Sequence, residues 1–355
     1  MPPAPHRKFD DIRKATFLAS WKPKLKSSQN WIGFIISLIF LVLILKSVER
    51  KQFFEVIRNV KYWPILPALL VYFIGVYFRA VRWQILLQPI KDIPLTIQFK
   101  IITIGYMANN LLPLRAGEFY RAHLLGKKED ISRSAVFSSI VLERVFDGLA
   151  MLFFLAILSL ILVAPFPGWV SVVAYFSFSF FLCLFLFFLL IVTSPAKFSS
   201  ILEVMLKVVP SRFRQSARNL SHNALTGLES LKGWKVIIKV LIISIITWLF
   251  EASMYYFLFY SFTFHVEYLG AVLLVTLVNL GIMIPSSPGY VGTFEFFCTH
   301  TLAIFSVSET VAFSYSILLH FILFLPITLV GLYHFWSLGL TPEEQNPQFE
   351  EQDID

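Results

Sequence analysis

Residues 169–193 read WVSVVAYFSFSFFLCLFLFFLLIVT, a run whose only ionisable side chains are Cys183 and Tyr175. A helix rises 1.5 Å per residue, so a run of this length can cross the hydrocarbon core of a bilayer, which is about 30 Å thick. Residues 311–335 form a second such run, in which His320 and His334 are the only ionisable groups besides tyrosine. Neither run alternates like a barrel strand, so both predict membrane-spanning helices.

The composition of the whole chain supports this class. Of its 355 residues, 57% are hydrophobic and 15% are charged, whereas soluble domains carry about a quarter charged residues. The net charge of +8 comes from segments that flank the apolar runs, which indicates contact with anionic lipid rather than nucleic acid. Both cysteines lie in apolar segments and the histidines are scattered, so we expect no disulfide framework, no metal site and no cofactor.

The chain divides into three parts: a basic tail at 1–30, a transmembrane domain at 31–340 and an acidic tail at 341–355. Because basic segments stay on the cytoplasmic side, we expect both termini in the cytoplasm of a bacterial cell, with the domain in its inner membrane. Segment 46–63 would then be external although it is rich in lysine and arginine, which leaves the first span, at 31–45, less well defined.

Two similar units make up most of the transmembrane domain. They cover about residues 64–164 and 236–335, and a basic cytoplasmic linker at 195–235 lies between them. Each unit consists of a span, a segment broken by proline and glycine, and another span. With the basic segments in the cytoplasm, the units cross the membrane in opposite directions. The sequence therefore predicts an all-α polytopic membrane protein with an inverted-topology repeat and two re-entrant broken helix pairs.

The two broken segments have related sequences. Residues 109–119 read NNLLPLRAGEF, and residues 279–296 read NLGIMIPSSPGYVGTFEF. Both lead from Asn-Leu to a proline and continue through Pro-x3-Gly to Glu-Phe. Proline removes a backbone donor and glycine permits a sharp reversal, so the freed backbone groups can face a ligand, although a pair of kinked, packed helices is the alternative. The predicted structural breaks are Pro113, Gly117, Pro285, Pro288, Gly289 and Gly292.

Charged residues lie within the apolar part of the chain, where each costs roughly 2.5–3.5 kcal/mol on insertion scales. Arginine suits a phosphate headgroup because its planar guanidinium donates two parallel hydrogen bonds. The candidate substrate-binding residues are Arg79, Asn110, Arg115, Glu118, Arg144, Asp147, Asn279 and Glu295. Alternatively, Arg79, Arg82, Glu143 and Arg144 lie near the interface or pair with one another. Glu251 could be a lone protonated carboxyl group within its span.

Three motifs carry a resemblance to a known family. In order, they are Asn109-Asn110-Leu-Leu-Pro113-x-Arg115-Ala-Gly117-Glu118, Glu143-Arg144-x2-Asp147-Gly148 and Pro285-x2-Pro288-Gly289-x2-Gly292-x2-Glu295. Together they resemble the lysylphosphatidylglycerol synthase transmembrane, or flippase-like, domain family over about residues 30–340. The resemblance implies a lipid-handling domain whose two re-entrant regions meet at the membrane centre. The two-domain synthases also carry a soluble aminoacyltransferase domain, whereas a short acidic tail follows here, so we expect no lipid lysinylation and no catalytic residues.

The leading prediction is a translocator of a phosphate-bearing lipid or lipid-linked intermediate, with an anionic headgroup as its ligand. One alternative is a non-catalytic membrane partner of a lipid- or glycan-modifying enzyme. A membrane transferase is less favoured, because no Asp-x-Asp pair lies at a membrane surface. A solute transporter with the same repeat is a further alternative. The chain has no phosphate-binding loop of the P-loop type, so we do not expect it to use ATP directly.

Overall fold

The computed structural model describes residues 38–40, 42–43, 48–112, 115–161, 167–193, 233–284 and 287–338, and within these ranges all regular structure is helical. Four helices are long and apolar enough to cross a membrane: α4 (Ile65–Leu87), α7 (Arg133–Ile161), α11 (Trp234–Phe259) and α14 (Glu309–Ser337). The prediction of an all-α polytopic membrane protein is therefore confirmed. The two tails, most of the first span, most of the linker, Pro113 and Pro285 lie outside the described residues.

The two broken segments form pairs of short helices. The first pair is α5 (Leu95–Leu111) and α6 (Ala116–Glu129). The second is α12 (Tyr268–Gly281) and α13 (Thr293–Ala303), with the short 3-10 helix η3 (Pro288–Tyr290) between them. Each of these helices is shorter than the roughly 20 residues that a span needs. Because α5 contacts α6 and α12 contacts α13, the two helices of each pair pack against each other. That these pairs are re-entrant in a membrane stays a prediction.

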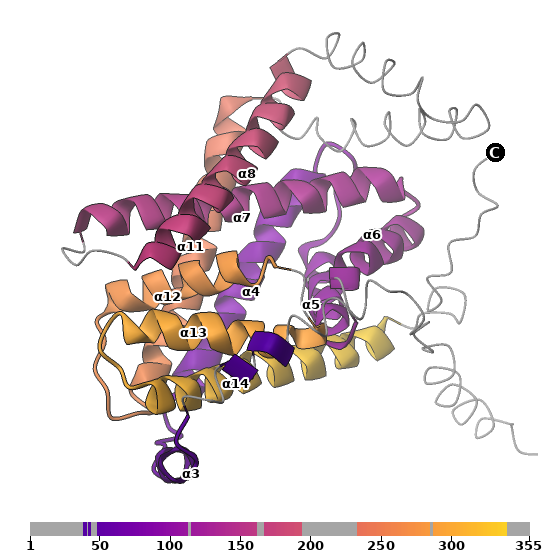
Figure 1. Ribbon diagram of the computed structural model, residues 1–355. Coiled ribbons are helices and arrows are strands. Elements are labelled where there is room, and N and C mark those ends of the chain that lie inside the picture. The colour runs from indigo at the N-terminus through magenta and orange to yellow at the C-terminus, as the bar shows by residue number, and fades with distance from the viewer. Residues whose placement is uncertain are drawn as a thin grey trace, which may run out of the picture.

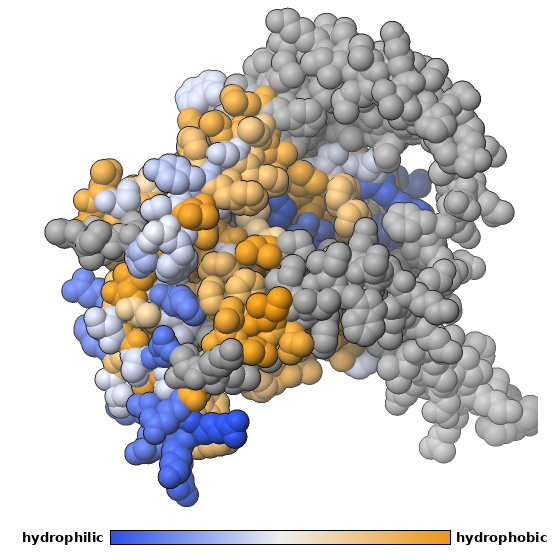
Figure 2. Space-filling model, viewed as in Figure 1, coloured by the Kyte–Doolittle hydropathy of each residue, from blue (hydrophilic) through white to orange (hydrophobic). Residues whose placement is uncertain are grey.

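Two further helices lie outside the repeated units. Helix α3 (Arg50–Arg58) has no buried residue, contacts α14 and carries the hydrophilic side chains that gather at the bottom of the molecule (Figures 1 and 2). This amphipathic helix lies within segment 46–63, the lysine- and arginine-rich stretch that the sequence predicts to be external. Helix α8 (Gly168–Thr193) covers the apolar run at residues 169–193 and packs against α7 and α12. Its surface is largely apolar, as expected for a helix that faces lipid.

Helices α4 and α11, which open the two units, cross at the centre of the molecule. Later residues of α4 meet earlier residues of α11: Phe78 stacks on Phe250, whereas Arg82 reaches Ser244. The helices therefore run antiparallel. A Cβ atom at Gly75 would lie 3.3 Å from the Cβ of Phe250, so a small residue at this position lets the two helices approach closely. This is the orientation that the predicted inverted repeat requires of its two first spans.

The contacts between the other helices also occur in matching sets. Helices α5, α6 and α7 of the first unit correspond to α12, α13 and α14 of the second. Helix α5 contacts α14, and α12 likewise contacts α7. Helix α6 contacts α7, and α13 likewise contacts α14. Likewise, α4 contacts α5 and α7, while α11 contacts α12 and α14. Each broken pair thus lies between the final long helices of both units, with α12, α13 and α14 stacked in layers in Figure 1.

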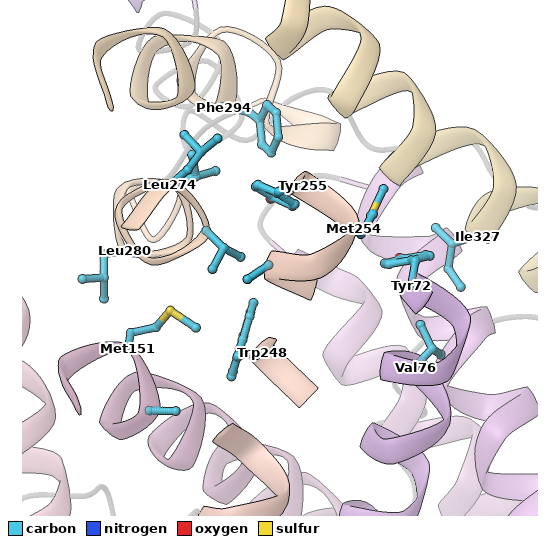
Figure 3. Packing of buried hydrophobic residues seen from close by; sticks show 14 of the residues in the cluster. Tyr72, Val76, Met151, Trp248, Met254, Tyr255, Leu274, Leu280, Phe294 and Ile327 are labelled. Carbon is cyan, nitrogen blue, oxygen red and sulfur yellow. The ribbon is translucent and has the colours of Figure 1, made fainter. Parts of the chain in front are cut away.

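One hydrophobic core is shared by both units. Figure 3 shows side chains from α4, α7, α11, α12, α13 and α14 converging in it. Trp248 and Tyr255 of α11 lie at its middle, between Met151 of the first unit and Phe294 of the second. Lipid tails are as apolar as these side chains, so close packing rather than burial from water holds the helices together. The shared core fixes the two broken pairs relative to each other.

Candidate functional site

A cavity of about 140 Å³ lies where the two broken pairs meet. Apolar and aromatic side chains form much of its wall, and five of those labelled in Figure 3 are among them: Tyr72, Trp248, Tyr255, Phe294 and Ile327. Its polar lining comes from both units and consists of Arg79, Tyr106, Asn109, Asn110, Arg115, Glu118, Arg144, Glu251, Asn279, Tyr290 and His320. An apolar pocket with a few convergent polar groups is typical of a ligand site.

The two breaks touch each other at this cavity. Arg115 precedes α6 in a left-handed conformation (φ 54°), and Tyr290 ends η3 in the same region of backbone space (φ 62°). The guanidinium carbon of Arg115 lies 5.5 Å from the centre of the Tyr290 ring. Its Nη2 donates a hydrogen bond of 3.2 Å to the carbonyl oxygen of Ile282, directly after α12. Arg115 therefore joins the first break to the second.

Gly117 allows α5 and α6 to pack closely at the first break. A Cβ atom at this position would lie 2.1 Å from the carbonyl oxygen of Gly105 and 2.6 Å from Oδ1 of Asn109, so α5 and α6 could not approach as they do with any other residue. The backbone N–H of Gly117 also donates to that Asn109 oxygen at 2.9 Å. The predicted role of Gly117 as a structural break therefore has a direct steric cause.

The second break has backbone angles that favour glycine. Gly289 lies in the left-handed region at φ 68°, and Gly292 has φ 88° where it caps α13. Pro288 begins η3, a position where its missing N–H costs nothing. All three were predicted as breaks, and all three lie in the turn between α12 and α13.

Arg79 and Glu251 form a buried ion pair across the α4–α11 crossing. The guanidinium of Arg79 also donates to the Tyr106 hydroxyl at 2.6 Å and lies over the indole of Trp248, 4.6 Å from the ring centre. The sequence treated Glu251 by itself, as a buried carboxyl group that could be protonated, whereas the structure gives it Arg79 as a partner. Its partner lies 172 residues earlier in the chain, which no local pattern reveals.

Arg144 faces the cavity with incomplete hydrogen bonding. Its Nε lies 3.6 Å from a carboxylate oxygen of Glu118, and its Nη1 lies 3.4 Å from Asp147. The first distance is too long for a hydrogen bond. Within the described residues, Nε of Arg144 is buried and has no hydrogen-bond partner. Its charge is thus balanced by Glu118 and Asp147, while donor capacity remains for a ligand.

Arg115 is the cavity arginine whose charge has no close counterpart. In the part of the chain that the structure describes, no carboxylate lies within 4.0 Å of its guanidinium, in contrast to Arg79 and Arg144. The Ile282 carbonyl and the Tyr290 ring hold it by neutral contacts. Positive charge is therefore in excess at the point where the two breaks meet.

A network of buried charges lies behind the cavity wall. Arg82 pairs with Asp147 at 2.6 Å and with Glu143 at 3.4 Å, and Glu143 also accepts from Arg121 at 2.9 Å. Arg82 is 0% exposed and Arg121 is 1% exposed, so these arginines do not snorkel to an interface. The alternative in which the charges pair with one another holds for Arg82 and Glu143. Arg121 begins a basic stretch of the sequence, residues 121–133, but it is buried against Trp83.

Asp147 and Glu295 therefore support the site rather than line it. Asp147 accepts hydrogen bonds from Arg82 and from the Trp248 indole and balances Arg144. One carboxylate oxygen of Glu295 accepts the backbone N–H of Gly292 at 2.6 Å, and the other contacts Nδ1 of His320. Both carboxylates are buried behind groups that reach the cavity.

The structure thus brings together most of the predicted site. The predicted residues that line the cavity are Arg79, Asn110, Arg115, Glu118, Arg144 and Asn279. Sequence reasoning missed Tyr106, Tyr290 and His320 as site residues, and it treated Glu251 separately. The correspondence of His320 with Arg144 appears only once the helix starts are known. His320 lies eleven residues after the first residue of α14, as Arg144 lies eleven residues after the first residue of α7.

Two asparagines play different parts in the lining. The side-chain amide of Asn110 donates to Thr328 Oγ1 at 2.9 Å and to the Phe324 carbonyl at 3.2 Å, which ties α5 to α14. The amide of Asn279 donates to the Val275 carbonyl of its own helix at 2.8 Å.

Within the described residues, no group of three histidine, cysteine or acidic side chains could hold a metal ion.

Comparisons with known proteins place this geometry in a family. Residues 30–331 match the family model described as the lysylphosphatidylglycerol synthase TM region. The UPF0104 membrane protein MJ1595 of Methanocaldococcus jannaschii is 24% identical over 87% of this chain and 94% of its own length. The UPF0104 membrane protein MJ1078 of the same organism is 28% identical over 68% of this chain and 99% of its own length.

A third relative, the UPF0104 membrane protein PH1989 of Pyrococcus horikoshii, is 25% identical over 83% of this chain and 92% of its own length. No solved structure matches the chain. The family model covers both units, both breaks and the cavity between them. The chain belongs to the lysylphosphatidylglycerol synthase transmembrane-region family.

Proposed function

We propose that this protein moves a phosphate-bearing lipid between the leaflets of the cytoplasmic membrane and binds the phosphate in the cavity between the two breaks. The observation that carries the proposal is the unpaired charge of Arg115 in the part of the chain that the structure describes. Its guanidinium lines the cavity and lacks a carboxylate partner among the described residues. Arg115 is half-buried, and a positive charge partly removed from water without a carboxylate partner is unfavourable, so an anionic ligand would stabilise it.

The size of the cavity fits a phosphate rather than a whole lipid. Its volume of about 140 Å³ is close to the ~150 Å³ of an engineered cavity that binds benzene. The acyl chains must then remain outside, in contact with apolar surface. Exposed apolar side chains flank both breaks, with Leu111 and Phe119 beside the first and Ile284 and Val291 beside the second.

The donors around the cavity suit a phosphate oxygen. Arg115 and Arg144 come from the first break and from α7, and both retain N–H groups that carboxylates do not fully satisfy. Guanidinium groups bind phosphate through charge-assisted hydrogen bonds, which are stronger than neutral ones. Arg79, whose charge is paired with Glu251, shapes the wall instead.

The relation between the two units supports movement of the ligand from one side to the other. Arg79 lies eight residues before the last residue of α4, and its partner Glu251 lies eight residues before the last residue of α11. Arg115 and Tyr290 each follow the proline of a Pro-x3-Gly motif by two residues, and they also face each other. Equivalent residues that meet in pairs are expected on a two-fold axis, so we place such an axis through the cavity. Inverted repeats of this kind permit access from alternate sides.

Lipid binding by the purified protein tests the proposal. The lipids retained by wild type and by Arg115→Ala are identified and counted by mass spectrometry, with Arg58→Ala on the exposed helix α3 as the matched control. We expect one phosphate-bearing lipid to be enriched in wild type and in the control. Loss of charge-assisted hydrogen bonds worth about 1.5–3 kcal/mol predicts binding about tenfold to a hundredfold weaker in Arg115→Ala.

Transport is then measured in vesicles that contain the enriched lipid with a fluorescent headgroup. Wild type and Arg58→Ala are expected to expose the labelled lipid to a reagent in the outer solution, whereas Arg115→Ala does so slowly. Equal lipid retention in all three proteins contradicts the proposed site. Retention of a stoichiometric protein partner without lipid movement favours the alternative in which the chain positions an enzyme.

A further inference from the structure

We infer that the cavity binds a proton together with the phosphate, and that His320, paired with Glu295, is the group that takes up the proton. The inference rests on the proposed function, because it assigns a coupling ion to the same site. It starts from a comparison of the two units at equivalent positions. In each unit, a glutamate near the break pairs with a basic residue on the following long helix.

The equivalence holds at both ends of each pair. Glu118 is the third residue of α6, and Glu295 is the third residue of α13. Their partners, Arg144 and His320, each lie eleven residues beyond the start of α7 and α14. Both partners line the cavity. The first unit thus presents a permanent cation, while the second presents an imidazole, a side chain that can be either neutral or cationic.

The contacts of the His320 ring determine where the proton binds. Nδ1 faces the Glu295 carboxylate, whose other oxygen already accepts the Gly292 N–H, so Nδ1 carries a hydrogen and donates to Glu295. The ring packs against Phe294 at 4.5 Å between centres, and the side chain is 13% exposed. Nε2, at the opposite edge from Glu295, is the nitrogen left to face the cavity. Protonation there creates both a cation and a donor for a phosphate oxygen.

The other charged groups around the cavity set the sign of the coupling. Every element around His320 contributes titratable or charged side chains to the cavity. They are Tyr72 and Arg79 of α4, Tyr106 of α5, Arg115 at the first break, Glu118 of α6, Arg144 of α7, Glu251 and Tyr255 of α11, and Tyr290 of η3. Arg79 neutralises Glu251, and Glu118 faces Arg144. Arg115 is left in excess and disfavours a further cation. A bound phosphate reverses this effect, so phosphate and proton each favour binding of the other.

This coupling has a consequence for transport. A phosphodiester headgroup carries one negative charge, and one proton on His320 compensates for that charge within the site. The lipid anion and the proton together carry no net charge, which lowers the electrostatic cost of moving them through the membrane as one cargo. A proton gradient across the membrane would act on the same step and give the movement a direction. The site therefore couples a lipid phosphate to a proton.

Binding measured as a function of pH tests the inference. The probe is phosphatidylglycerol, titrated into detergent-purified protein between about pH 5.5 and pH 8.5, because a phosphodiester, unlike a monoester, has no second ionisation in this range. In wild type we expect affinity to fall as pH rises, by up to about tenfold per pH unit over the range in which binding takes up one proton. In weakly buffered solution, binding at high pH should take up close to one proton per lipid.

Three variants separate the proton site from the phosphate site. His320→Arg, which copies the first unit, should keep the low-pH affinity at all pH values and take up no proton. His320→Gln should bind as weakly at low pH as wild type does at high pH. His300→Gln is the matched control, since His300 of α13 contacts the Phe296 carbonyl and does not line the cavity, and it should behave as wild type.

Two results would overturn the inference, and they separate it from the proposed function. If wild type binds phosphatidylglycerol equally at all pH values, or if His320→Arg keeps the full pH dependence, the proton is not bound at His320. The proposed function survives that result as long as Arg115→Ala still weakens binding. If wild type binds no phosphatidylglycerol at any pH, or if Arg115→Ala has no effect, both the phosphate site and the proton site are wrong.

Discussion

The two units of this protein share an order of helices but not a distribution of charge. In the first unit, α4, α6 and α7 carry buried or half-buried arginines and carboxylates that form a continuous network. In the second, the described parts of α11, α13 and α14 contribute Glu251, Glu295 and His320 at the corresponding depth. The comparison separates two roles. Proline and glycine build the breaks in both units, whereas the few charged positions that differ assign a chemical task to each.

The difference is clearest where equivalent residues face each other. Arg79 meets Glu251, and Arg115 meets the ring of Tyr290. A repeat with identical residues at these positions would bring like charges together, which is unfavourable at low dielectric constant. The residues that differ between the two units therefore make these contacts attractive.

The largest expected effect, on the free energy of unfolding, comes from replacing Glu143 of the first unit by leucine, the residue at the corresponding position of the second unit. Glu143 lies one residue before Arg144, and Leu319 lies one residue before His320. Glu143→Leu leaves Arg121 without its carboxylate and Arg82 with Asp147 alone. Removal of one partner from a buried ion pair costs roughly 3–5 kcal/mol, and we expect this loss in the free energy of unfolding, measured by denaturant titration in mixed micelles. The control Glu129→Gln removes the exposed pair with Lys91 and should cost about 1 kcal/mol or less; equal losses in the two variants would contradict the difference.

The next effect tests the close approach of α5 and α6 at the first break. Gly117→Ala places a methyl group against backbone atoms of Gly105 and Asn109, which cannot yield as a side-chain end can. We expect a loss of roughly 1–3 kcal/mol in the free energy of unfolding, measured in the same way. At Gly168, a Cβ atom would meet nothing within 4 Å, so Gly168→Ala should leave stability unchanged or raise it slightly. A stable Gly117→Ala protein would mean that α5 and α6 can separate without cost.

A smaller effect tests the contact between the breaks. Tyr290→Leu removes the ring beneath Arg115, while Tyr290→Phe keeps the ring and removes the hydroxyl group. A cation–π contact is worth about 0.5–2 kcal/mol, so binding of phosphatidylglycerol should weaken about twofold to thirtyfold in Tyr290→Leu. Tyr290→Phe should bind as wild type does. If both variants bind equally weakly, the hydroxyl group rather than the ring positions Arg115.

The smallest effect distinguishes the two asparagines. Asn110 joins the first unit to α14 of the second, so Asn110→Ala should lower the free energy of unfolding by about 1 kcal/mol. Asn279 bonds to a carbonyl of its own helix, which already takes part in helix hydrogen bonding, so Asn279→Ala should cost a few tenths of a kcal/mol. The two variants are compared in one denaturant titration. A larger loss in Asn279→Ala than in Asn110→Ala would contradict this ranking of the two amides.

The sequence by itself determined the helical class, the long spans and the positions of the breaks. These features are local, because lipid requires backbone groups to be satisfied within a segment and because proline and glycine act on their own backbone. The run at 311–335 predicted α14 to within two residues at each end. The coincidence of Arg115 and Glu118 with a break also identified the lining of the cavity before its partners were known.

Only the tertiary structure decided which charges meet. Arg79 and Arg82 are three residues apart on one helix, yet the first lines the cavity and the second is buried behind it. Arg121 belongs to a basic stretch, but packing of α6 against α4 and α7 buries it beside Glu143. His320 contacts Glu295 only because α13 packs against α14. Such pairings depend on which helices pack together and in what register, and that information is spread over contacts between residues far apart in the chain.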